Sequence, residues 1–404
     1  MNVIFLTLAN IGDIQGRGIY VDLIRKFRDE GHQIYVVSPC ERRLHLETSL
    51  TDCFNVKILQ VKTLNLQKSN IVEKGIGTLL LESQYKRAIR KYLSGIRFDL
   101  VLYSTPPITI YGVVRYLKLM CPQAISYLLL KDIFPQNAVD IGYFGEKSLF
   151  YWYFRRMEVG LYKISDYIGC MSPANVVYLK KHNPYYPKSR VEVAPNSIEM
   201  IDDNSFCDID KREIRLKYGL PTDKPIFIYG GNLGKPQGIE FLIKCLDANK
   251  TRKDCFFLVV GNGTDYSKLS FWYENNVHKN VMLLSYLPKA DYQLLVKSCD
   301  VGLIFLDHRF TIPNYPSRLL SYLECRMPVI CATDINTDVG SIAEKNGYGF
   351  WCESVKVEDF SALVDKMLAS DIKDMGERGY NYLKENYSVL NTYSIIVSHI
   401  SSVK

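Results

Sequence analysis

A glycine-spaced loop between an apolar run and a helical pattern is the part of this chain best suited to bind a phosphate. Residues 226–229 are β-branched or aromatic and end at a pair of glycines, and residues 239–246 place apolar side chains at helical spacing. This order predicts a strand, a glycine loop and a helix. Glycines let backbone N–H groups approach an anion, and the N-terminus of a helix favours negative charge. The candidate phosphate contacts here are Gly230, Asn232 and Lys235.

Two later segments supply candidates for the rest of a nucleotide. The apolar run 256–260 ends at a glycine, and the strand expected at 281–284 is soon followed by an aromatic and an aliphatic residue. Ligands of parallel sheets lie at the carboxyl ends of strands, so these positions are expected to face a base, with core packing as the competing interpretation. A cation stands just before a late helix. The candidates are Gly261, Tyr286 and Leu287 for the base, and Ser317, Arg318 and Leu319 at the late helix.

The first third of the chain holds a second glycine loop and a polar strand end. The apolar run 3–8 is followed by glycines at positions 12, 16 and 18, and the run 128–130 leads into a lysine and an aspartate. Polar groups at a strand end are typical of working sites in α/β sheets. Asp132 is the candidate catalytic residue, expected to orient or deprotonate a hydroxyl; a turn or helix-cap carboxylate is the competing interpretation. The candidate phosphate contacts of this half are Gly16, Arg17 and Gly18.

Short apolar runs alternate with helical patterns along the chain, which predicts an α/β fold with parallel sheets covered on both faces. The alternation is interrupted by a polar stretch at 196–205, the expected hinge, and then restarts. We therefore expect two doubly wound, Rossmann-like domains facing a cleft, over residues 1–197 and 198–385, with a last helix in 386–404 that packs back on the first domain. The expected strands are 3–8, 33–37, 56–58, 100–103, 125–130, 167–170, 191–193, 226–229, 256–260, 281–284, 301–306 and 328–331. The helices expected in the first half are 19–30, 78–94, 108–119 and 148–164.

Composition limits the class of protein. The chain has 404 residues, of which 47% are hydrophobic and 23% charged, with a net charge of +7; these values are ordinary for a soluble protein of two domains. No run of about 18 apolar residues predicts a spanning helix, and the apolar start lacks a basic leader, so we expect a first strand there. The 11 cysteines are scattered and the six histidines form no ligand pair, which predicts reduced thiols, a cytosolic protein and no metal site. No nucleic-acid motif accompanies the basic residues.

Six segments, taken together, carry a resemblance to a known family. They are residues 12–18, 30–37, 165–173, 193–197, 230–238 and 313–330. In this order they resemble glycosyltransferases of the GT-B architecture, and more closely the retaining, nucleotide-sugar-dependent family 4, over nearly the whole chain. The resemblance implies a nucleotide-sugar donor held by the second domain and an acceptor held by the first, with retention of configuration. It implies no metal and no other cofactor, so backbone N–H groups and cations must stabilise the leaving diphosphate.

The chain departs from the family pattern in two segments. The family often carries two glutamates across the late loop and helix, where this chain has Pro313 and Ser321. The second glutamate normally grips the ribose hydroxyls, and Glu324, one helical turn further on, is a candidate replacement. In the diphosphate loop many relatives have a basic residue directly before the last glycine. Here Gln237 stands in that place, and Lys235 lies two residues earlier.

The resemblance also implies an acceptor class. Relatives frequently build bacterial surface polysaccharides, such as capsule or O-antigen, on polyprenyl-diphosphate carriers. The aromatic run 150–154, followed by two arginines, suits an anionic membrane face, with core packing as the competing interpretation. We therefore expect a cytoplasmic enzyme at the periphery of the cell membrane. It is expected to transfer a hexosyl or N-acetylhexosaminyl unit, by family frequency from a UDP-sugar, to a lipid-linked or oligosaccharide acceptor.

Two other functions stay open at this stage. A nucleotide-sugar epimerase on the same fold would release a free sugar without an acceptor, whereas a phosphorylase needs a lysine-bound pyridoxal site, for which no residue argues. A non-catalytic partner subunit would keep the fold, and the missing glutamates favour it. The presence of Lys235, Arg318 and the glycine loops argues against it, because an inactive copy does not need them.

Overall fold

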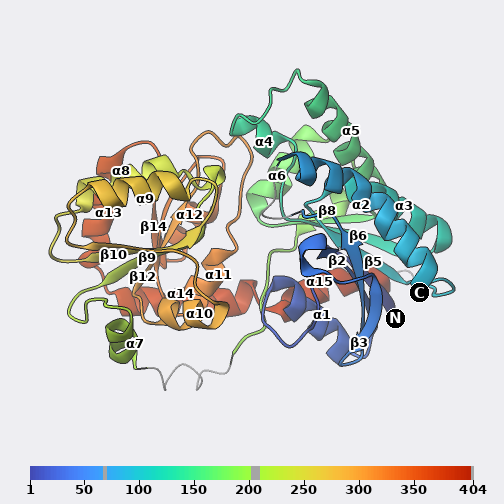
Figure 1. The fold of residues 1–404 in the computed structure, drawn as a ribbon, viewed down its shortest axis with the longest axis horizontal. Helices are drawn as coiled ribbons and strands as arrows, with labels where there is room; N and C mark the ends of the chain where they lie inside the picture. Colours follow the sequence, from blue (N-terminus) through green and yellow to red (C-terminus); the bar gives the residue numbers. More distant parts are fainter. Residues whose placement is uncertain (67–70, 202–209, 402–404) are drawn as a thin grey trace. The chain divides into compact units, whose positions relative to one another are not determined.

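The computed structural model of the chain describes residues 1–66, 71–201 and 210–401, and it divides into two compact units (Figure 1). The first unit is Met1–Glu199 with Ser388–Lys404, and the second is Met200–Tyr387. The chain therefore leaves the first unit after Glu199, where the prediction was residue 197, and returns at Ser388, where the prediction was residue 386. The expected hinge at 196–205 lies partly outside the described residues.

The first unit contains a predominantly parallel sheet in the order β3-β4-β2-β1-β5-β6-β7-β8. Strand β3 pairs antiparallel with β4 at one edge and was not predicted, because its residues alternate without a buried face. The other strand pairs are parallel. The strands are β1 (Asn2–Leu6), β2 (Gln33–Glu41), β3 (Ser49–Cys53), β4 (Val56–Thr63), β5 (Leu100–Ser104), β6 (Ile125–Leu130), β7 (Tyr167–Cys170) and β8 (Val191–Val193).

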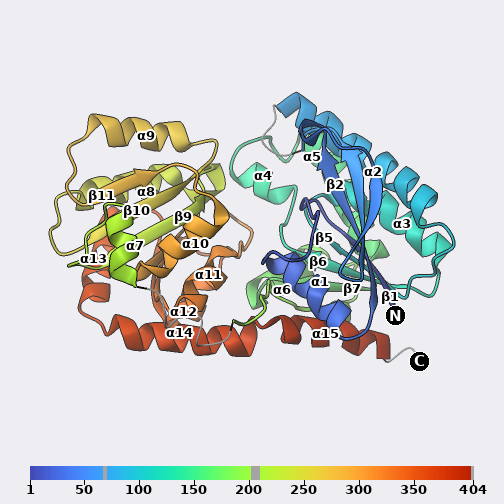
Figure 2. The ribbon, with the colours of Figure 1, turned by 60° about the horizontal axis from the view of Figure 1, so that its bottom comes forward.

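Helices cover both faces of this sheet (Figure 2). Helices α2, α3 and α5 pack against one another on one face, and α1 and α15 pack together on the other. The helix expected at 78–94 begins earlier, and the one at 108–119 starts with a 3₁₀ turn at Ile108–Ile110. The helices of this unit are α1 (Ile19–Asp29), α2 (Ile71–Tyr92), α3 (Tyr111–Met120), α4 (Gln136–Asp140), α5 (Leu149–Ile164), α6 (Pro173–His182) and α15 (Val389–Ser401).

The second unit contains a parallel sheet in the order β11-β10-β9-β12-β13-β14. Strands β9 and β10 pair in register as far as Asn232 and Asn262, so both continue past the glycines at which they were predicted to end. Those glycines therefore belong to strands, and the loop after β9 begins later than expected. The strands are β9 (Ile226–Asn232), β10 (Phe256–Asn262), β11 (Val281–Leu284), β12 (Val301–Phe305), β13 (Val329–Thr333) and β14 (Gly349–Glu353).

The second sheet is also covered on both faces, with α8, α9 and α13 on one and α10, α11 and α14 on the other (Figure 1). The chain is thus α/β, with two Rossmann-like units, as the alternation of elements predicted. The cleft expected between the units stays a prediction. The helices here are α7 (Lys211–Lys217), α8 (Ile239–Asn249), α9 (Tyr266–Asn275), α10 (Lys289–Lys297), α11 (Arg318–Glu324), α12 (Val339–Lys345), α13 (Val357–Leu368) and α14 (Ile372–Asn386).

The last helix, α15, is part of the first unit's core. Its apolar residues Val389, Ile396 and Ile400 join the same buried cluster as β1 and α1. Two polar contacts fix it further: His32 Nε2 lies 2.9 Å from the Tyr393 hydroxyl, and His399 Nε2 lies 2.8 Å from Glu192 Oε1. Among the described residues, no helix is long and apolar enough to cross a membrane.

Candidate functional site

In the first unit the sheet grows in both directions from β1, so the strand order reverses between β1 and β5. Ligands of open parallel sheets bind at the carboxyl ends of the strands beside such a point. The segments that follow these ends are the glycine loop after β1, the Thr105 turn after β5 and the Lys131-Asp132 pair after β6. The prediction from sequence and the topology therefore both point to the carboxyl ends of β1, β5 and β6 as the place of the site.

Thr105 is fully buried and fixes the end of β6. Its hydroxyl oxygen accepts hydrogen bonds from the backbone N–H groups of Lys131 (3.1 Å) and Asp132 (3.3 Å). The same hydroxyl donates to the carbonyl oxygen of Asp132 at 3.2 Å. On the other side, Asn137 Nδ2 of α4 donates to Asp132 Oδ1 at 2.7 Å. The backbone and one oxygen of Asp132 are therefore held in place.

Burial shifts the pKa values of both ionisable side chains at this strand end toward neutral pH. It raises the pKa of the Asp132 carboxyl to about 6, although the hydrogen bond from Asn137 acts in the opposite direction. It also lowers the pKa of the Lys131 ammonium to about 7. Desolvation disfavours the charged form of either group, which explains both directions. A carboxyl group with a pKa near 6 is suited to general acid–base catalysis.

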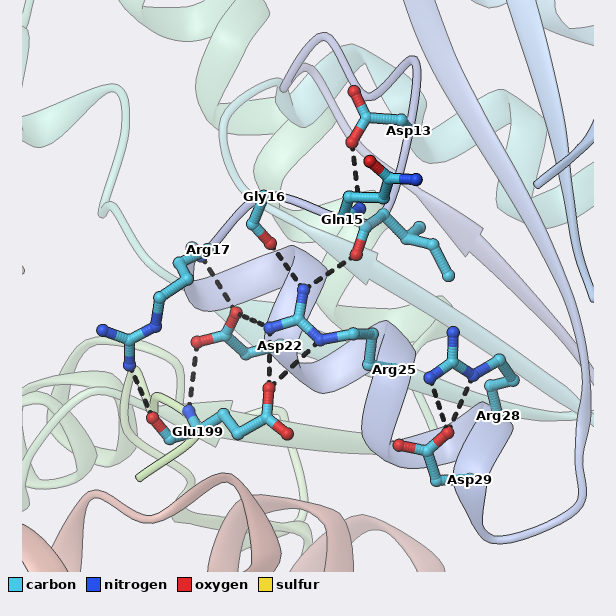
Figure 3. A network of polar contacts seen from close by, with 11 residues as sticks. Asp13, Gln15, Gly16, Arg17, Asp22, Arg25, Arg28, Asp29 and Glu199 are labelled. Atoms are coloured by element: carbon cyan, nitrogen blue, oxygen red, sulfur yellow. Dashed lines mark hydrogen bonds and ion pairs between the residues drawn. The ribbon is translucent and has the colours of Figure 1, made fainter. Parts of the chain in front are cut away.

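The glycine loop after β1 is held by Arg25 of α1 (Figure 3). Arg25 Nη1 donates to the carbonyl oxygens of Ile14 (2.8 Å) and Gly16 (2.5 Å), and its Nη2 donates to Asp22 Oδ1 (2.7 Å). Asp22 has a fully buried side chain, and its carboxylate also accepts a hydrogen bond from the N–H of Gly18 at 3.0 Å. The loop thus has a defined shape before any ligand arrives.

These contacts correct one prediction and leave two open. The N–H of Gly18 is used by Asp22 and is not available to a phosphate, so Gly18 does not bind an anion in the way predicted. Gly16 lies in open space, since an added Cβ would meet no atom within 4 Å. Arg17 is half-buried, and its Nη2 donates to the carbonyl oxygen of Glu199 at 2.6 Å.

In the second unit the strand order reverses between β9 and β12. At the end of β9, close packing requires a glycine at position 230, because a Cβ there would lie 2.0 Å from the Tyr292 hydroxyl oxygen. Its N–H donates to the Tyr322 hydroxyl oxygen at 3.0 Å. The prediction that Gly230 offers its N–H to a phosphate is therefore wrong. A Cβ on Gly261 would lie 1.9 Å from the carbonyl oxygen of Gly231, so this glycine lets the two strands approach.

The loop between β9 and α8 is shaped by an amide pair. Asn232 Nδ2 donates to Gln237 Oε1 at 3.0 Å, and the N–H of Gly234 donates to the same oxygen at 3.3 Å. Gln237, which stands where many relatives have a basic residue, therefore stabilises the loop from within. Lys235 begins the 3₁₀ turn of this loop and is half-buried. The loop ends at Gly238, whose φ of 58° lies in the left-handed region that glycine favours.

Arg318, the first residue of α11, lies over the end of β9. Its guanidinium carbon is 4.3 Å from the ring centre of Tyr229, which is a cation–π distance. A Cβ on Gly231 would be 3.6 Å from this guanidinium group, so the cation rests against bare backbone. Among the described residues, the Arg318 Nη1 atom is buried without a hydrogen-bond acceptor. A buried donor of this kind calls for an acceptor, and an anionic ligand would supply one.

The remaining candidates of the second unit are placed as follows. Leu319 is fully buried, so its side chain cannot touch a ligand, and the prediction that it binds the donor is corrected to a role in packing α11. Ser317 is exposed beside Arg318. Tyr286 is 67% exposed and Leu287 half-buried in the segment after β11, so base binding there stays a prediction. Glu324 is half-buried on α11 and stays the candidate for the ribose.

Sequence reasoning missed the tyrosines around Gly230 and the ion pair on α1. Tyr229 ended an expected strand, Tyr322 lay within the late family-like segment, and Tyr292 was not singled out. The usable signal was an aromatic residue next to a pair of glycines. Asp22 and Arg25 stand three residues apart, the spacing of a helical ion pair, with Asp22 on the buried face.

The two units therefore offer different chemistry. The second presents, at its switch point, the Arg318 guanidinium, whose buried Nη1 has no hydrogen-bond acceptor among the described residues, and this group is suited to an anion such as a diphosphate. The first presents a carboxyl group that changes charge near pH 6. Within the part of the chain that the structure describes, no group of three His, Cys, Asp or Glu side chains could hold a metal ion.

Comparison with known proteins assigns a domain to the second unit. Residues 210–383 match the model of the family described as "Glycosyl transferases group 1". The probable glycosyltransferase WbjE of Pseudomonas aeruginosa is 23% identical over 304 residues, 72% of each chain. The putative colanic acid biosynthesis glycosyl transferase WcaI of Escherichia coli K12 is 25% identical over 37% of each chain. These matches support a glycosyltransferase with relatives in bacterial polysaccharide biosynthesis.

Solved structures bear on the fold alone. The structure of Anabaena Alr3699/HepE in complex with UDP aligns with a TM-score of 0.68 at 14% identity, and the alignment covers 100% of both chains. The chain therefore has two α/β, Rossmann-like units, and its neighbours among solved structures are GT-B glycosyltransferases, which agrees with the expected architecture.

Proposed function

We propose that this chain is a retaining glycosyltransferase of family 4 that transfers a hexosyl or N-acetylhexosaminyl unit from a UDP-sugar to a lipid-linked saccharide in the synthesis of a bacterial surface polysaccharide. The observation that carries the proposal is the Arg318 guanidinium, which rests on Tyr229 and Gly231 and whose buried Nη1 finds no acceptor in the part of the chain that the structure describes. It lies within the residues that match the glycosyltransferase model. The HepE structure holds UDP, and a UDP-sugar is the donor we propose here by analogy.

In the proposed reaction the second unit binds the donor and the first unit acts on the acceptor. Arg318 and Lys235 stabilise the negative charge that grows on the leaving nucleoside diphosphate. Asp132 orients or deprotonates the acceptor hydroxyl, which a carboxylate with a pKa of about 6 can do at neutral pH. Arg17 adds a further cation toward the diphosphate, and no metal is required.

A thermal-shift screen against UDP, GDP, ADP, CMP and their sugars tests donor binding. We expect one nucleoside diphosphate to stabilise the protein, by about 2.7 kcal/mol at a hundredfold excess over its dissociation constant. Lys235→Ala should remove most of this shift, because the proposal assigns its ammonium to the charge of the diphosphate. Lys244→Ala is the matched control, since it removes the same charge from an exposed position on α8.

The outcomes of this screen separate the competing functions. No shift with any nucleotide would contradict the proposal and favour a non-catalytic partner. A shift accompanied by release of free sugar in the absence of an acceptor would favour an epimerase.

An exposed apolar surface on α5 supports an acceptor at a membrane. Leu149, Phe150 and Trp152 are 86%, 68% and 64% exposed, which is unusual for large apolar side chains so close together. The competing interpretation, core packing, does not fit these three residues. Exposed cations flank them: Lys147 precedes the helix, and the guanidinium of Arg156 lies 5.9 Å from the Trp152 ring centre. Aromatic side chains beside cations suit the interface of an anionic bilayer.

Removing this surface is expected to weaken membrane binding. The double variant F150S/W152S should partition at least about tenfold less into vesicles with 30% anionic lipid, because two large apolar groups no longer enter the interface. Sedimentation with vesicles at two salt concentrations measures the effect. Leu119→Ser, at a single 73% exposed leucine at the end of α3, is the control. Equal partitioning of the double variant and the wild type would remove the membrane from the proposal.

A further inference from the structure

Glu199, the last residue of the first unit, is bound at all of its polar groups by the glycine loop and α1 (Figure 3). Its N–H donates to Asp22 Oδ2 at 3.0 Å. Its carbonyl oxygen accepts from Arg17 Nη2 at 2.6 Å. Its carboxylate oxygen Oε2 accepts from Arg25 Nε at 3.1 Å and Nη2 at 2.7 Å.

Arg25 connects this residue to the loop that carries Arg17. The same guanidinium group binds the carbonyl oxygens of Ile14 and Gly16 through Nη1 and the carboxylate of Glu199 through Nε and Nη2. The Arg25 side chain is 13% exposed, whereas that of Glu199 is 50% exposed, so the contact between them lies at the surface of the unit. The position of Arg17 is therefore set both by its own bond to Glu199 and by the loop that Arg25 holds.

The chain that returns from the second unit is attached at the same place. The N–H of Val389 donates to the carbonyl oxygen of Ile198 at 2.9 Å, and the Thr392 hydroxyl donates to that of Pro195 at 3.3 Å. The two chain connections between the units, after Glu199 and before Ser388, are thus both attached to one hydrogen-bonded segment of the first unit. A change in the main chain at Glu199 reaches Arg17 through the hydrogen bond between the Glu199 carbonyl oxygen and Arg17 Nη2.

We propose that Arg25 and Glu199 are positioning residues: they hold the guanidinium of Arg17 where it meets the donor diphosphate, and they couple that position to the point where the chain enters the second unit. The proposal rests on the function proposed above, in which Arg17 contacts the donor. Neither residue touches the substrate. Their effect on donor binding passes through the carbonyl oxygen of Glu199 and the loop before Arg17.

Glu199→Ala is the most informative substitution. The Glu199 side chain is 50% exposed, so its loss should change stability little, whereas loss of Arg25 leaves the buried Asp22 carboxylate without its cation. We expect the variant to raise the donor KM about tenfold, the size of a typical coupling between sites, with kcat changed less than threefold. Arg28→Met is the matched control, because Arg28 pairs with Asp29 on the same helix and makes no contact with this network in Figure 3.

A double-mutant cycle distinguishes positioning from a general structural effect. In an Arg17→Met background, Glu199→Ala should no longer change the donor KM, because the group that it positions is absent. If the tenfold effect persists in that background, Glu199 acts by another route and the proposal is overturned. Arg25→Lys, which keeps the charge but cannot bind the loop and Glu199 together, should resemble Glu199→Ala.

Limited trypsin digestion gives a readout that does not depend on activity. The bond after Arg17 is the first that trypsin can cut in this chain. We expect the fragment ending at Arg17 to appear about tenfold faster in Glu199→Ala than in the wild type or Arg28→Met, because the loop opens more often. Equal rates of cleavage after Arg17 in Glu199→Ala and in the wild type would overturn the proposed coupling, even if the protein binds the donor. A faster rate in a protein that binds no nucleotide keeps the coupling and rejects the proposed function.

Discussion

Asp132→Asn is expected to lower kcat on the order of 10²–10⁴-fold, the contribution typical of a general base. The variant should keep its local structure, because an asparagine side-chain oxygen can still accept the hydrogen bond from Asn137 Nδ2. Thr105 binds only the main chain of this strand end, so its contacts are unaffected. Steady-state rates with donor and acceptor in excess measure the effect.

The same substitution should raise stability at neutral pH. Because burial raises the folded-state pKa of Asp132 from 3.8 to about 6, the folded state binds its proton more tightly than the unfolded state does. The stability gained from the protonated carboxyl is present at low pH and is lost as the pH rises through about 6. Above that pH the charged group destabilises the fold by on the order of 1–3 kcal/mol, which asparagine avoids. We therefore expect Asp132→Asn to be less active than the wild type but more resistant to heat at neutral pH.

The pH profile provides the second test of Asp132. If the carboxylate accepts a proton from the acceptor, kcat/KM should rise with pH through about 6 in the wild type and lose that limb in Asp132→Asn. Asp99→Asn is the control: this carboxylate accepts the N–H of Asn2 at the amino ends of the strands of the same sheet, whereas Asp132 follows a carboxyl end. Full activity in Asp132→Asn, with an unchanged profile, would assign Asp132 to the turn alone.

Arg318→Met should raise the dissociation constant for the nucleoside diphosphate about 10- to 100-fold. Hydrogen bonds between charged groups contribute about 1.5–3 kcal/mol each, and this guanidinium group has a buried donor without an acceptor in the described residues. Methionine can occupy the space on the Tyr229 ring and removes a half-buried charge. Thermal stability without nucleotide should therefore be unchanged or slightly higher, and titration calorimetry with UDP measures the loss of binding.

Arg326→Met is the matched control for this experiment. Arg326 also lies over a tyrosine ring, 4.2 Å from the centre of Tyr380, but it pairs with Glu377 and lies before the amino end of β13, whereas Arg318 lies over the carboxyl end of β9. Its loss should change stability little, because this ion pair is partly exposed, and should leave nucleotide binding intact. Equal nucleotide affinity in both variants would show that Arg318 serves packing alone.

The architecture could be predicted from the sequence because its signals are local. Buried parallel strands need continuous apolar runs, and the helices between them need apolar residues at a period near 3.6, so the order of elements can be read along the chain. Asp132 was chosen as a candidate for the same reason: the charged pair Lys131-Asp132 follows a fully buried strand and so lies at the carboxyl end of the sheet. Strand β3, with mostly exposed residues, lacked that signal.

By itself, the sequence determined the two α/β halves, the glycine loops and the cations near them. Only the tertiary structure decided which groups remain for a ligand. The N–H groups of Gly18 and Gly230 are taken by Asp22 and by Tyr322. Arg25 and Glu199 meet although they are 174 positions apart. A pattern along the chain reports which residues share a face, but a hydrogen bond between distant residues exists only once the sheet has brought them together.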